Sequence, residues 1–425
     1  MAYEALNNAG RLKTNFIIVL NDNNMSISEN VGGMSRYLNN LRADEGYNLL
    51  KKNVAGTLSR IPMIGSDLVG TLLRTKNSIK QLLIPGMWFE NMGITYLGPV
   101  DGHDIKGLIR IFSEAKKINR AVLIHVITKK GKGYRPAEKN PSAFHGVEPF
   151  DIETGKPLRK KEHPGYTDVF SREICRLAAE NPKIVAVTAA MPDGTGLKRF
   201  SKEYPDRFFD VGIAEEHALV LANALALSGM KPYVTIYSTF LQRGYDQVNH
   251  DIARMGGDVV VGIDRCGVIG EDGVSHQGIF DVSLLLPIPG ITLAQGKDAA
   301  ESARLLATGF ATEGPYLLRY SKNTMQEQAL CTEPLPVGRW ERLHTGEMTV
   351  ISYGDFVGEA EEARRLLELD GIAMGLVNAR FLKPFDTEMM DALLAEGKPL
   401  LIYEEVAAIG GLGSLLQQYA AERDS

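Results

Sequence analysis

Short runs of continuous apolar, mostly β-branched residues recur along this chain, and each is followed by turn residues and a helical pattern. Six runs are the clearest: residues 15–20, 121–127, 184–188, 258–263, 348–353 and 399–403. A continuous apolar run is typical of a strand buried on both faces of its sheet, and alternation with helices indicates parallel pairing. The pattern therefore predicts an α/β fold with parallel sheets.

The chain has 425 residues, which is enough for two or three domains. One boundary is expected near residue 160, in a polar and basic stretch, and another near 335, in a segment with two prolines. The predicted domains are residues 1–160, 161–335 and 336–425. The first ten residues have the pattern of a helix that is already under way and ends at Gly10, which suggests a missing beginning.

Composition excludes several classes of function. The net charge is -5 and the isoelectric point about 6.0, so the chain as a whole has no attraction to nucleic acid or to anionic membranes. No run approaches 18 apolar residues, and we expect no membrane span. The three cysteines, at positions 175, 266 and 331, lack CxxC or zinc spacing, which favours reduced thiols in a cytoplasmic protein.

Residues 34–90 interrupt the α/β rhythm with helical patterns that carry many lysines and arginines. A basic patch for nucleic acid is one interpretation of this segment. A solvated helical face or a mobile excursion is the other, and it is the one that the pattern favours.

An Asn-rich segment at residues 21–25 directly follows the first apolar run. Ligands of open α/β sheets collect at the carboxyl ends of the strands. Asn side-chain oxygens and backbone carbonyls are hard ligands that suit magnesium. The alternative is a turn without a ligand, because Asn and Asp favour turns in any case.

Two further segments carry charge next to strand ends. Residues 129–134 combine three lysines with two glycines, which fits either a phosphate-binding loop or an ordinary basic turn. Residues 210–217 place Glu215 and Glu216 at the start of a helix. One of these carboxyls is a candidate for a buried, proton-sharing group, but acidic residues also favour helix starts through the helix dipole.

Aromatic, acidic, basic and guanidinium groups follow two later strands. Tyr237 to Arg243 lie after one predicted strand, and Asp264, Arg265 and the Gly-rich loop around His276 follow the next. A lone histidine is usually structural. The surrounding glycines make an exposed, functional role for His276 an equal alternative.

These segments, taken in order, resemble the 1-deoxy-D-xylulose-5-phosphate synthase family. The matching stretches are residues 21–32, 98–104, 128–134, 212–218, 236–243 and 275–278. The resemblance spans essentially the whole chain. The broader transketolase and pyruvate-dehydrogenase relatives share the fold and the glutamate, but not this combination of motifs.

The resemblance implies three consecutive parallel-sheet domains of the thiamine-diphosphate-binding, transketolase-like type, of which the first and the last are incomplete. It also implies a homodimer. The cofactors would be thiamine diphosphate and Mg²⁺, with Asn23 and the carbonyl of Met25 as metal ligands. Tyr134 and Phe240 would lie at the cofactor, and Asn23 near its diphosphate. Glu215 would hydrogen-bond its aminopyrimidine ring, which favours the imino tautomer that removes the thiazolium proton.

The implied reaction joins pyruvate to D-glyceraldehyde 3-phosphate with loss of carbon dioxide, and its product feeds isoprenoid, thiamine and pyridoxal synthesis. His276 and His145 would handle protons or position substrate. The substrate-binding residues implied by the resemblance are Tyr237, Arg243, Arg265, Asp272 and Lys322.

The chain departs from the family pattern in two respects. The usual Arg-Tyr-Pro-Arg-Gly is replaced by the segment 319–323, in which Lys322 keeps the charge but loses bidentate phosphate geometry. The family's Gly-Asp-Gly magnesium motif would lie before Met1, and Ser425 falls inside the expected third domain. We therefore expect the chain alone to be inactive; the alternative is a non-catalytic remnant that only dimerises or binds a partner.

Overall fold

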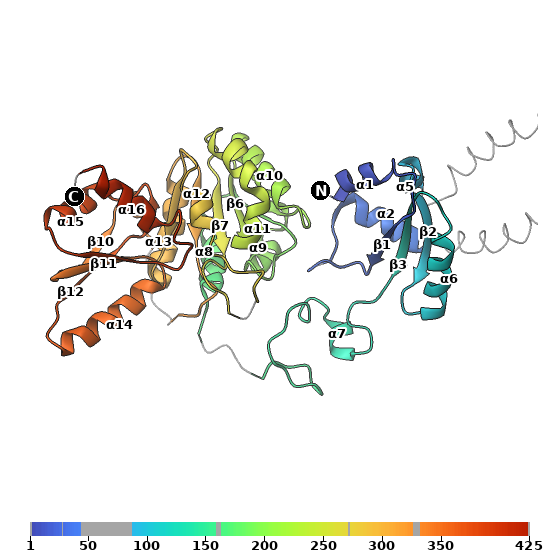
Figure 1. Ribbon diagram of the computed structural model, residues 1–425, viewed down its shortest axis with the longest axis horizontal. Coiled ribbons are helices and arrows are strands. Elements are labelled where there is room, and N and C mark those ends of the chain that lie inside the picture. Colours follow the sequence, from blue (N-terminus) through green and yellow to red (C-terminus); the bar gives the residue numbers. More distant parts are fainter. Residues whose placement is uncertain are drawn as a thin grey trace, which may run out of the picture. The chain divides into compact units, whose positions relative to one another are not determined.

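The computed structural model describes residues 2–27, 29–43, 87–158, 163–270, 273–325 and 332–423. The chain forms two compact units, Met1–Arg159 and Lys160–Ser425 (Figure 1). The segment 44–86, which holds most of the basic helical pattern, lies outside the described residues.

The first unit contains a three-stranded parallel sheet in the order β1-β3-β2. Its strands are β1 (Phe16–Asp22), β2 (Thr95–Asp101) and β3 (Ala121–Ile127). Its described helices are α1 (Ala2–Ala9), α2 (Gly32–Ala43), α5 (Met87–Asn91), α6 (Ile105–Ala115) and α7 (Arg135–Lys139). Side chains of α1, α2 and α5 pack on one face of the sheet, and those of α6 pack on the other.

The three strands differ in burial. Six of the seven residues of β3, the central strand, are buried, as the apolar run predicts. In β1 only Asp22 is buried, and Phe16 and Val19 remain about half exposed, at 48% and 49%. The prediction of burial on both faces is therefore wrong for β1, because within the described residues β1 pairs with β3 alone and lies at an edge.

The second unit is built on a seven-stranded sheet in the order β13-β8-β9-β7-β6-β4-β5. Its strands are β4 (Ile184–Thr188), β5 (Phe208–Asp210), β6 (Lys231–Tyr237), β7 (Val260–Asp264), β8 (Thr292–Gln295), β9 (Tyr316–Arg319) and β13 (Phe381–Lys383). Its helical segments are α8 (Tyr166–Glu180), α9 (Lys198–Glu203), η2 (Pro205–Arg207), α10 (Glu215–Leu227), α11 (Ser238–Leu241), η3 (Gln242–Gly244), η4 (Gln247–Ala253), α12 (Asp281–Leu285) and α13 (Ala299–Ala311).

The remainder of the second unit is a four-stranded sheet in the order β10-β12-β11-β14. Its strands are β10 (Glu341–His344), β11 (Met348–Ser352), β12 (Met374–Asn378) and β14 (Leu400–Tyr403). Its helices are α14 (Phe356–Leu369), α15 (Thr387–Ala395) and α16 (Leu412–Ala421) (Figure 1). β14 is an edge strand with alternating half-buried and exposed residues, so burial on both faces is wrong here as well.

The strand β13 joins the two sheets of the second unit. It follows β12 in the chain but pairs antiparallel with β8, at the edge of the seven-stranded sheet. Lys383, its last residue, donates from Nζ to the carbonyl of Leu286, 2.6 Å away, and also to that of Ile288.

All six apolar runs lie in or largely within strands. Among the strands that the structure describes, every pairing is parallel except those of β10 and β13 at sheet edges. The predicted α/β class is confirmed. The division into three domains at residues 160 and 335 stays a prediction. The chain separates into two compact units, and the second of them holds two sheets without a further division.

Candidate functional site

The Asn-rich segment after β1 forms a tight turn. Asn24 has a left-handed backbone with φ of 63°, a conformation that Asn tolerates better than most residues. The N–H of Met25 donates to Oδ1 of Asn23 at 2.9 Å, and the N–H of Asn24 donates to Oδ1 of Asp22 at 3.1 Å. The amide oxygen of Asn23 therefore closes the turn, and it retains a second lone pair for a ligand.

The side chain of Asp22 points into the first unit. It is 4% exposed, and its Oδ2 lies 2.9 Å from Nε2 of His125, whose Nδ1 lies 2.7 Å from the hydroxyl of Tyr96. A neutral imidazole protonated at Nε2 satisfies both contacts. The sequence gives no signal for His125, because this residue lies within an apolar run.

The lysine- and glycine-rich loop lies against the same turn. Nζ of Lys130 donates to the carbonyl of Ser26 at 2.8 Å and lies 3.0 Å from Nδ1 of His145. Partial burial and the adjacent Lys130 ammonium both lower the pKa of His145. His145 is therefore shifted toward its neutral form, in which Nδ1 can accept a hydrogen bond from the Lys130 ammonium.

Tyr134 packs in an aromatic cluster with Phe144 and Phe150. Its ring centroid lies 5.5 Å from that of Phe144 and 5.9 Å from that of Phe150. Its hydroxyl donates to the carbonyl of Ile152 at 2.9 Å. Lys130 thus links His145 to the backbone of the turn that holds Asn23 and Met25, while the Tyr134 hydroxyl is bonded to the backbone.

In the second unit, Glu215 begins helix α10, directly after the Gly-containing turn that follows β5. Its side chain is 2% exposed, and burial raises the pKa of its carboxyl. Arg243 opposes that rise: its Nη1 lies 2.5 Å from Oε2 of Glu215, and its Nη2 lies 3.5 Å from Oε2 of Glu216. Arg243, which the resemblance places among the substrate-binding residues, is thus paired here with the candidate catalytic carboxyl.

Aromatic rings and a cation gather at the carboxyl ends of β6 and β7. Tyr237 stacks on Phe240 with centroids 5.5 Å apart, and Phe240 meets the edge of His276 at the same distance. The guanidinium carbon of Arg265 lies 3.8 Å from the ring centroid of Tyr237, a cation–π contact. Tyr237 is fixed by close packing, since a Cβ at Gly194 would lie 1.8 Å from its hydroxyl oxygen.

Asp264, the last residue of β7, is fully buried beside this cluster. Burial raises the pKa of its carboxyl to about 7, against the opposing effects of Arg265, Thr167 and Lys322. Thr167 donates to its Oδ2 at 3.1 Å, whereas its Oδ1 has no hydrogen-bond partner among the described residues. A signal for Asp264 was present in the sequence, because it ends an apolar run and precedes an arginine.

The structure gives less information on two other predicted site residues, Lys322 and Asp272. Lys322 lies in a loop that Asp355 holds through hydrogen bonds from Ser321 and Asn323. Asp272 lies outside the described residues.

The part of the chain that the structure describes contains no group of three or more His, Cys, Asp or Glu side chains that could hold a metal ion. No described helix is long and apolar enough to cross a membrane.

Sequence profiles of three families match consecutive parts of the chain. The profile described as 1-deoxy-D-xylulose-5-phosphate synthase matches residues 1–128, the transketolase pyrimidine binding domain matches 162–328, and the transketolase C-terminal domain matches 338–424.

Known structures and curated sequences agree with these profiles. A split-gene transketolase, solved as an inactive β4 tetramer, is 27% identical with a TM-score of 0.56, over 62% of this chain and 87% of its own. Transketolase from Leishmania mexicana has the same fold, with a TM-score of 0.52 at 15% identity, over 99% of this chain and 71% of its own.

The 1-deoxy-D-xylulose-5-phosphate synthase of Lachnoclostridium phytofermentans is 48% identical over 100% of this chain and 68% of its own length. That of Desulfitobacterium hafniense is 47% identical over 98% of this chain and 67% of its own. The chain thus spans about two thirds of these relatives, and it belongs to the 1-deoxy-D-xylulose-5-phosphate synthase family of transketolase-like, thiamine-diphosphate enzymes.

Proposed function

We propose that this chain carries the larger part of a synthase that condenses pyruvate with D-glyceraldehyde 3-phosphate, with loss of carbon dioxide. The product would be 1-deoxy-D-xylulose 5-phosphate, a precursor for isoprenoids, thiamine and pyridoxal. The enzyme would act in the cytoplasm as a homodimer. The observation that carries the proposal is the buried carboxyl of Glu215, held by Arg243 at a helix start in a chain of this family.

The residues of the second unit fit the pyrimidine end of thiamine diphosphate. A buried carboxyl with a raised pKa can hydrogen-bond a ring nitrogen, and the half-buried ring of Phe240 offers an apolar face for stacking. When bound, the cofactor supplies an electron sink for decarboxylation. Glu215 would hold a proton at the aminopyrimidine, and Arg243 would keep that carboxyl oriented.

The remaining residues of this cluster suit an anionic acceptor. Arg265 offers a guanidinium that can bind a phosphate in bidentate fashion, and Lys322 adds a point charge nearby. Tyr237 and Asp272 would line the pocket. His276 lies at the ring of Phe240 and 2.7 Å from the hydroxyl of Ser275, where it can exchange a proton with substrate.

The first unit fits the metal and diphosphate only in part. Asn23 and the carbonyl of Met25 are oxygen ligands of the kind that Mg²⁺ takes, and Tyr134 would lie near the cofactor. Magnesium normally also uses one or two carboxylates. Asp22 is turned away to His125 and does not supply one. We therefore expect the magnesium site to need a carboxylate from outside the described residues.

This proposal predicts that the 425-residue chain alone binds thiamine diphosphate and Mg²⁺ weakly and has no synthase activity. Calorimetry with both ligands measures binding, and release of carbon dioxide from pyruvate plus aldehyde measures turnover. The matched control is the same chain co-expressed with the part of the L. phytofermentans relative that this chain does not match. Tight binding with robust turnover by the chain alone would contradict an incomplete site. No turnover in the co-expressed pair would favour a non-catalytic partner-binding module.

A further inference from the structure

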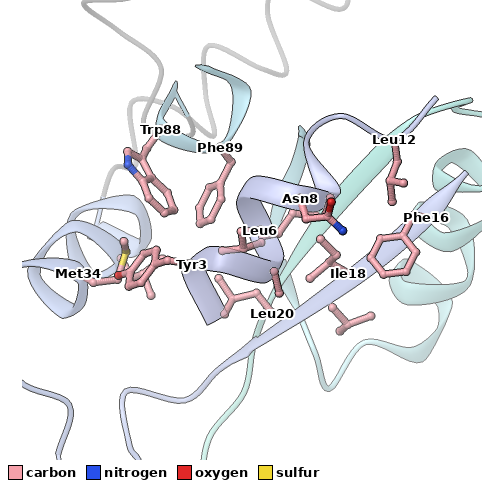
Figure 2. A pocket seen from close by; sticks show the side chains of 15 residues that line it. Tyr3, Leu6, Asn8, Leu12, Phe16, Ile18, Leu20, Met34, Trp88 and Phe89 are labelled. Atoms are coloured by element: carbon pink, nitrogen blue, oxygen red, sulfur yellow. The ribbon is translucent and has the colours of Figure 1, made fainter. Parts of the chain in front are cut away.

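Two hollows of the molecule differ in the chemistry of their walls. One of about 740 Å³ lies in the first unit, and Figure 2 shows apolar side chains turned toward it, including Leu6 and Phe16. The other lies in the second unit, and its walls include Arg319, Asp355 and Glu405. At about 10 Å³ it is too small for a substrate, so its charged side chains act on the protein itself. Among them, Glu405 contacts a loop of the candidate active site.

That loop follows strand β7 and carries His276. Its described residues are 267–270 and 273–278, and we call them the His276 loop. Two hydrogen bonds of 2.8 Å, one in each direction, join Gly267 to Gly278 at its base. Inside it, Oε1 of Gln277 accepts from the N–H of Ile269 at 2.7 Å, and Nε2 donates to the carbonyl of Ile269 at 2.8 Å. These bonds set the shape of the loop, but they do not fix its position on the rest of the unit.

Glu405, which follows strand β14, anchors the base of the His276 loop. Its Oε1 accepts from the N–H of Val268 at 2.9 Å, across 137 residues of sequence. Its Oε2 lies so close to Gly267 that a Cβ at that position would come within 2.1 Å of it. Gly267 also has a φ of 84°, a conformation that favours glycine. The carboxyl of Glu405 therefore occupies a space that a side chain at position 267 would close.

The segment that follows Glu405 makes two further contacts just beyond the loop. The N–H of Ala407 donates to the carbonyl of Ile279 at 2.9 Å, and the hydroxyl of Ser283 donates to the carbonyl of Ile409 at 2.8 Å. Glu404 fixes the segment itself, because its carboxylate accepts two backbone N–H groups at the start of α16. The chain on both sides of the His276 loop is thus hydrogen-bonded to the part of the unit that carries the four-stranded sheet.

We propose that Glu405 is a positioning residue for His276, which it holds beside Phe240 by fixing the base of the loop. The ring centroids of His276 and Phe240 lie 5.5 Å apart. An acid or base acts only within hydrogen-bond reach of its proton, and a misplacement of about 1 Å can cost about a hundredfold in rate. The chain after residue 335, which holds none of the predicted site residues, would thereby contribute to the chemistry. The role of His276 rests on the proposed function, whereas the anchor rests on the contacts alone.

Three substitutions at position 405 separate reach from charge. Glu405→Asp keeps the carboxylate but is shorter by one methylene, so it should lose the hydrogen bond to Val268. Glu405→Gln keeps the length, and its amide oxygen can accept the same N–H, so it should restore the behaviour of the parent. Glu405→Ala removes both the length and the charge. The matched control is Glu362→Ala on α14, where the side chain is 64% exposed.

Hydrogen–deuterium exchange of the 425-residue chain tests the anchor without any assay of activity. Amides of the His276 loop should exchange at least about tenfold faster in Glu405→Asp and Glu405→Ala, because a hydrogen bond that opposes local opening is lost. They should stay within about twofold of the parent in Glu405→Gln and in Glu362→Ala. Unchanged exchange of the β7 amides shows that each variant still folds.

Turnover of the chain co-expressed with the unmatched part of the L. phytofermentans relative tests the consequence. Glu405→Asp should lower kcat by about tenfold or more, and Glu405→Gln should restore it. His276→Ala alone should lower kcat by about 10²–10⁴-fold. Added to His276→Ala, Glu405→Asp should cost less than about a further twofold, because the two residues act as one unit.

Three results would overturn the inference. One is loop exchange that neither Glu405→Asp nor Glu405→Ala accelerates, and another is a loosened loop with the kcat of the parent. The third is a loss of kcat in Glu405→Asp that persists in full in the His276→Ala background. An inactive parent pair, or full activity of His276→Ala, would instead contradict the proposed function, and the exchange of the loop would still decide for or against the anchor.

Discussion

Strands β1 and β7 have similar apolar sequences but different surroundings. All five residues of β7 are buried, because β6 pairs on one side, β9 on the other, and both faces are covered. In β1 five apolar residues leave two side chains about half exposed, because β3 is its only described partner. An apolar run therefore specifies a strand, whereas the strands beside it decide how far that strand is buried.

The largest expected effect is a loss of turnover on substitution of Glu215 in the second unit. In the co-expressed pair, Glu215→Ala should reduce turnover by about 10²–10⁴-fold, the usual contribution of a positioned acid or base. Arg243 is one third exposed and can turn to solvent, so the fold should persist. Turnover and circular dichroism are measured in parallel, with Glu216→Ala as the control. Activity within threefold of the parent would remove Glu215 from the mechanism.

Core substitutions test the difference in burial directly. Leu317→Ala in β9, where the side chain is fully buried, should lower the free energy of unfolding by about 2–5 kcal/mol. Leu20→Ala in β1, where the side chain is half-buried, should cost about 1–2 kcal/mol in the chain alone. Denaturant unfolding gives both values. Equal costs in the chain alone would show that the two strands do not differ in how much their burial contributes to stability.

The buried Asp264 predicts a pH dependence of the second unit. Its pKa is raised to about 7 in the folded state, so the folded protein retains a proton that the unfolded chain loses near pH 4. The stability contributed by this group is therefore full below about pH 4 and falls as the pH rises to 7, by up to about 4 kcal/mol. Asp264→Asn should flatten the stability profile between these values. An unchanged slope would mean that Asp264 is ionised in the fold.

The smallest of these effects concerns substrate preference. Arg265→Ala in the co-expressed pair should raise the KM for glyceraldehyde 3-phosphate by about 10–100-fold, as expected for loss of a charged hydrogen bond. The KM for pyruvate, which has no phosphate, should change little. Arg254→Ala, an exposed arginine in the same unit, is the control. Equal changes for both substrates would show that Arg265 does not bind the phosphate.

The strands and their parallel pairing were predictable because apolar periodicity is a local property of the sequence. The direction of Asp22 was predictable for the same reason, from strand alternation. Its partner His125 was not, because 103 residues separate the two and only the pairing of β1 with β3 brings them together. The contact between Arg243 and Glu215 likewise depends on packing across 28 residues.

The strand β13 links the stability of residues 336–425 to that of the seven-stranded sheet. Because Phe381 is fully buried on the edge strand next to β8, removal of everything after residue 335 would uncover apolar surface and leave β8 with an unpaired side. The two sheets of this unit should therefore unfold in one transition, and a chain cut between them should be less stable. Evolution can vary the loops of this unit far more easily than it can divide it.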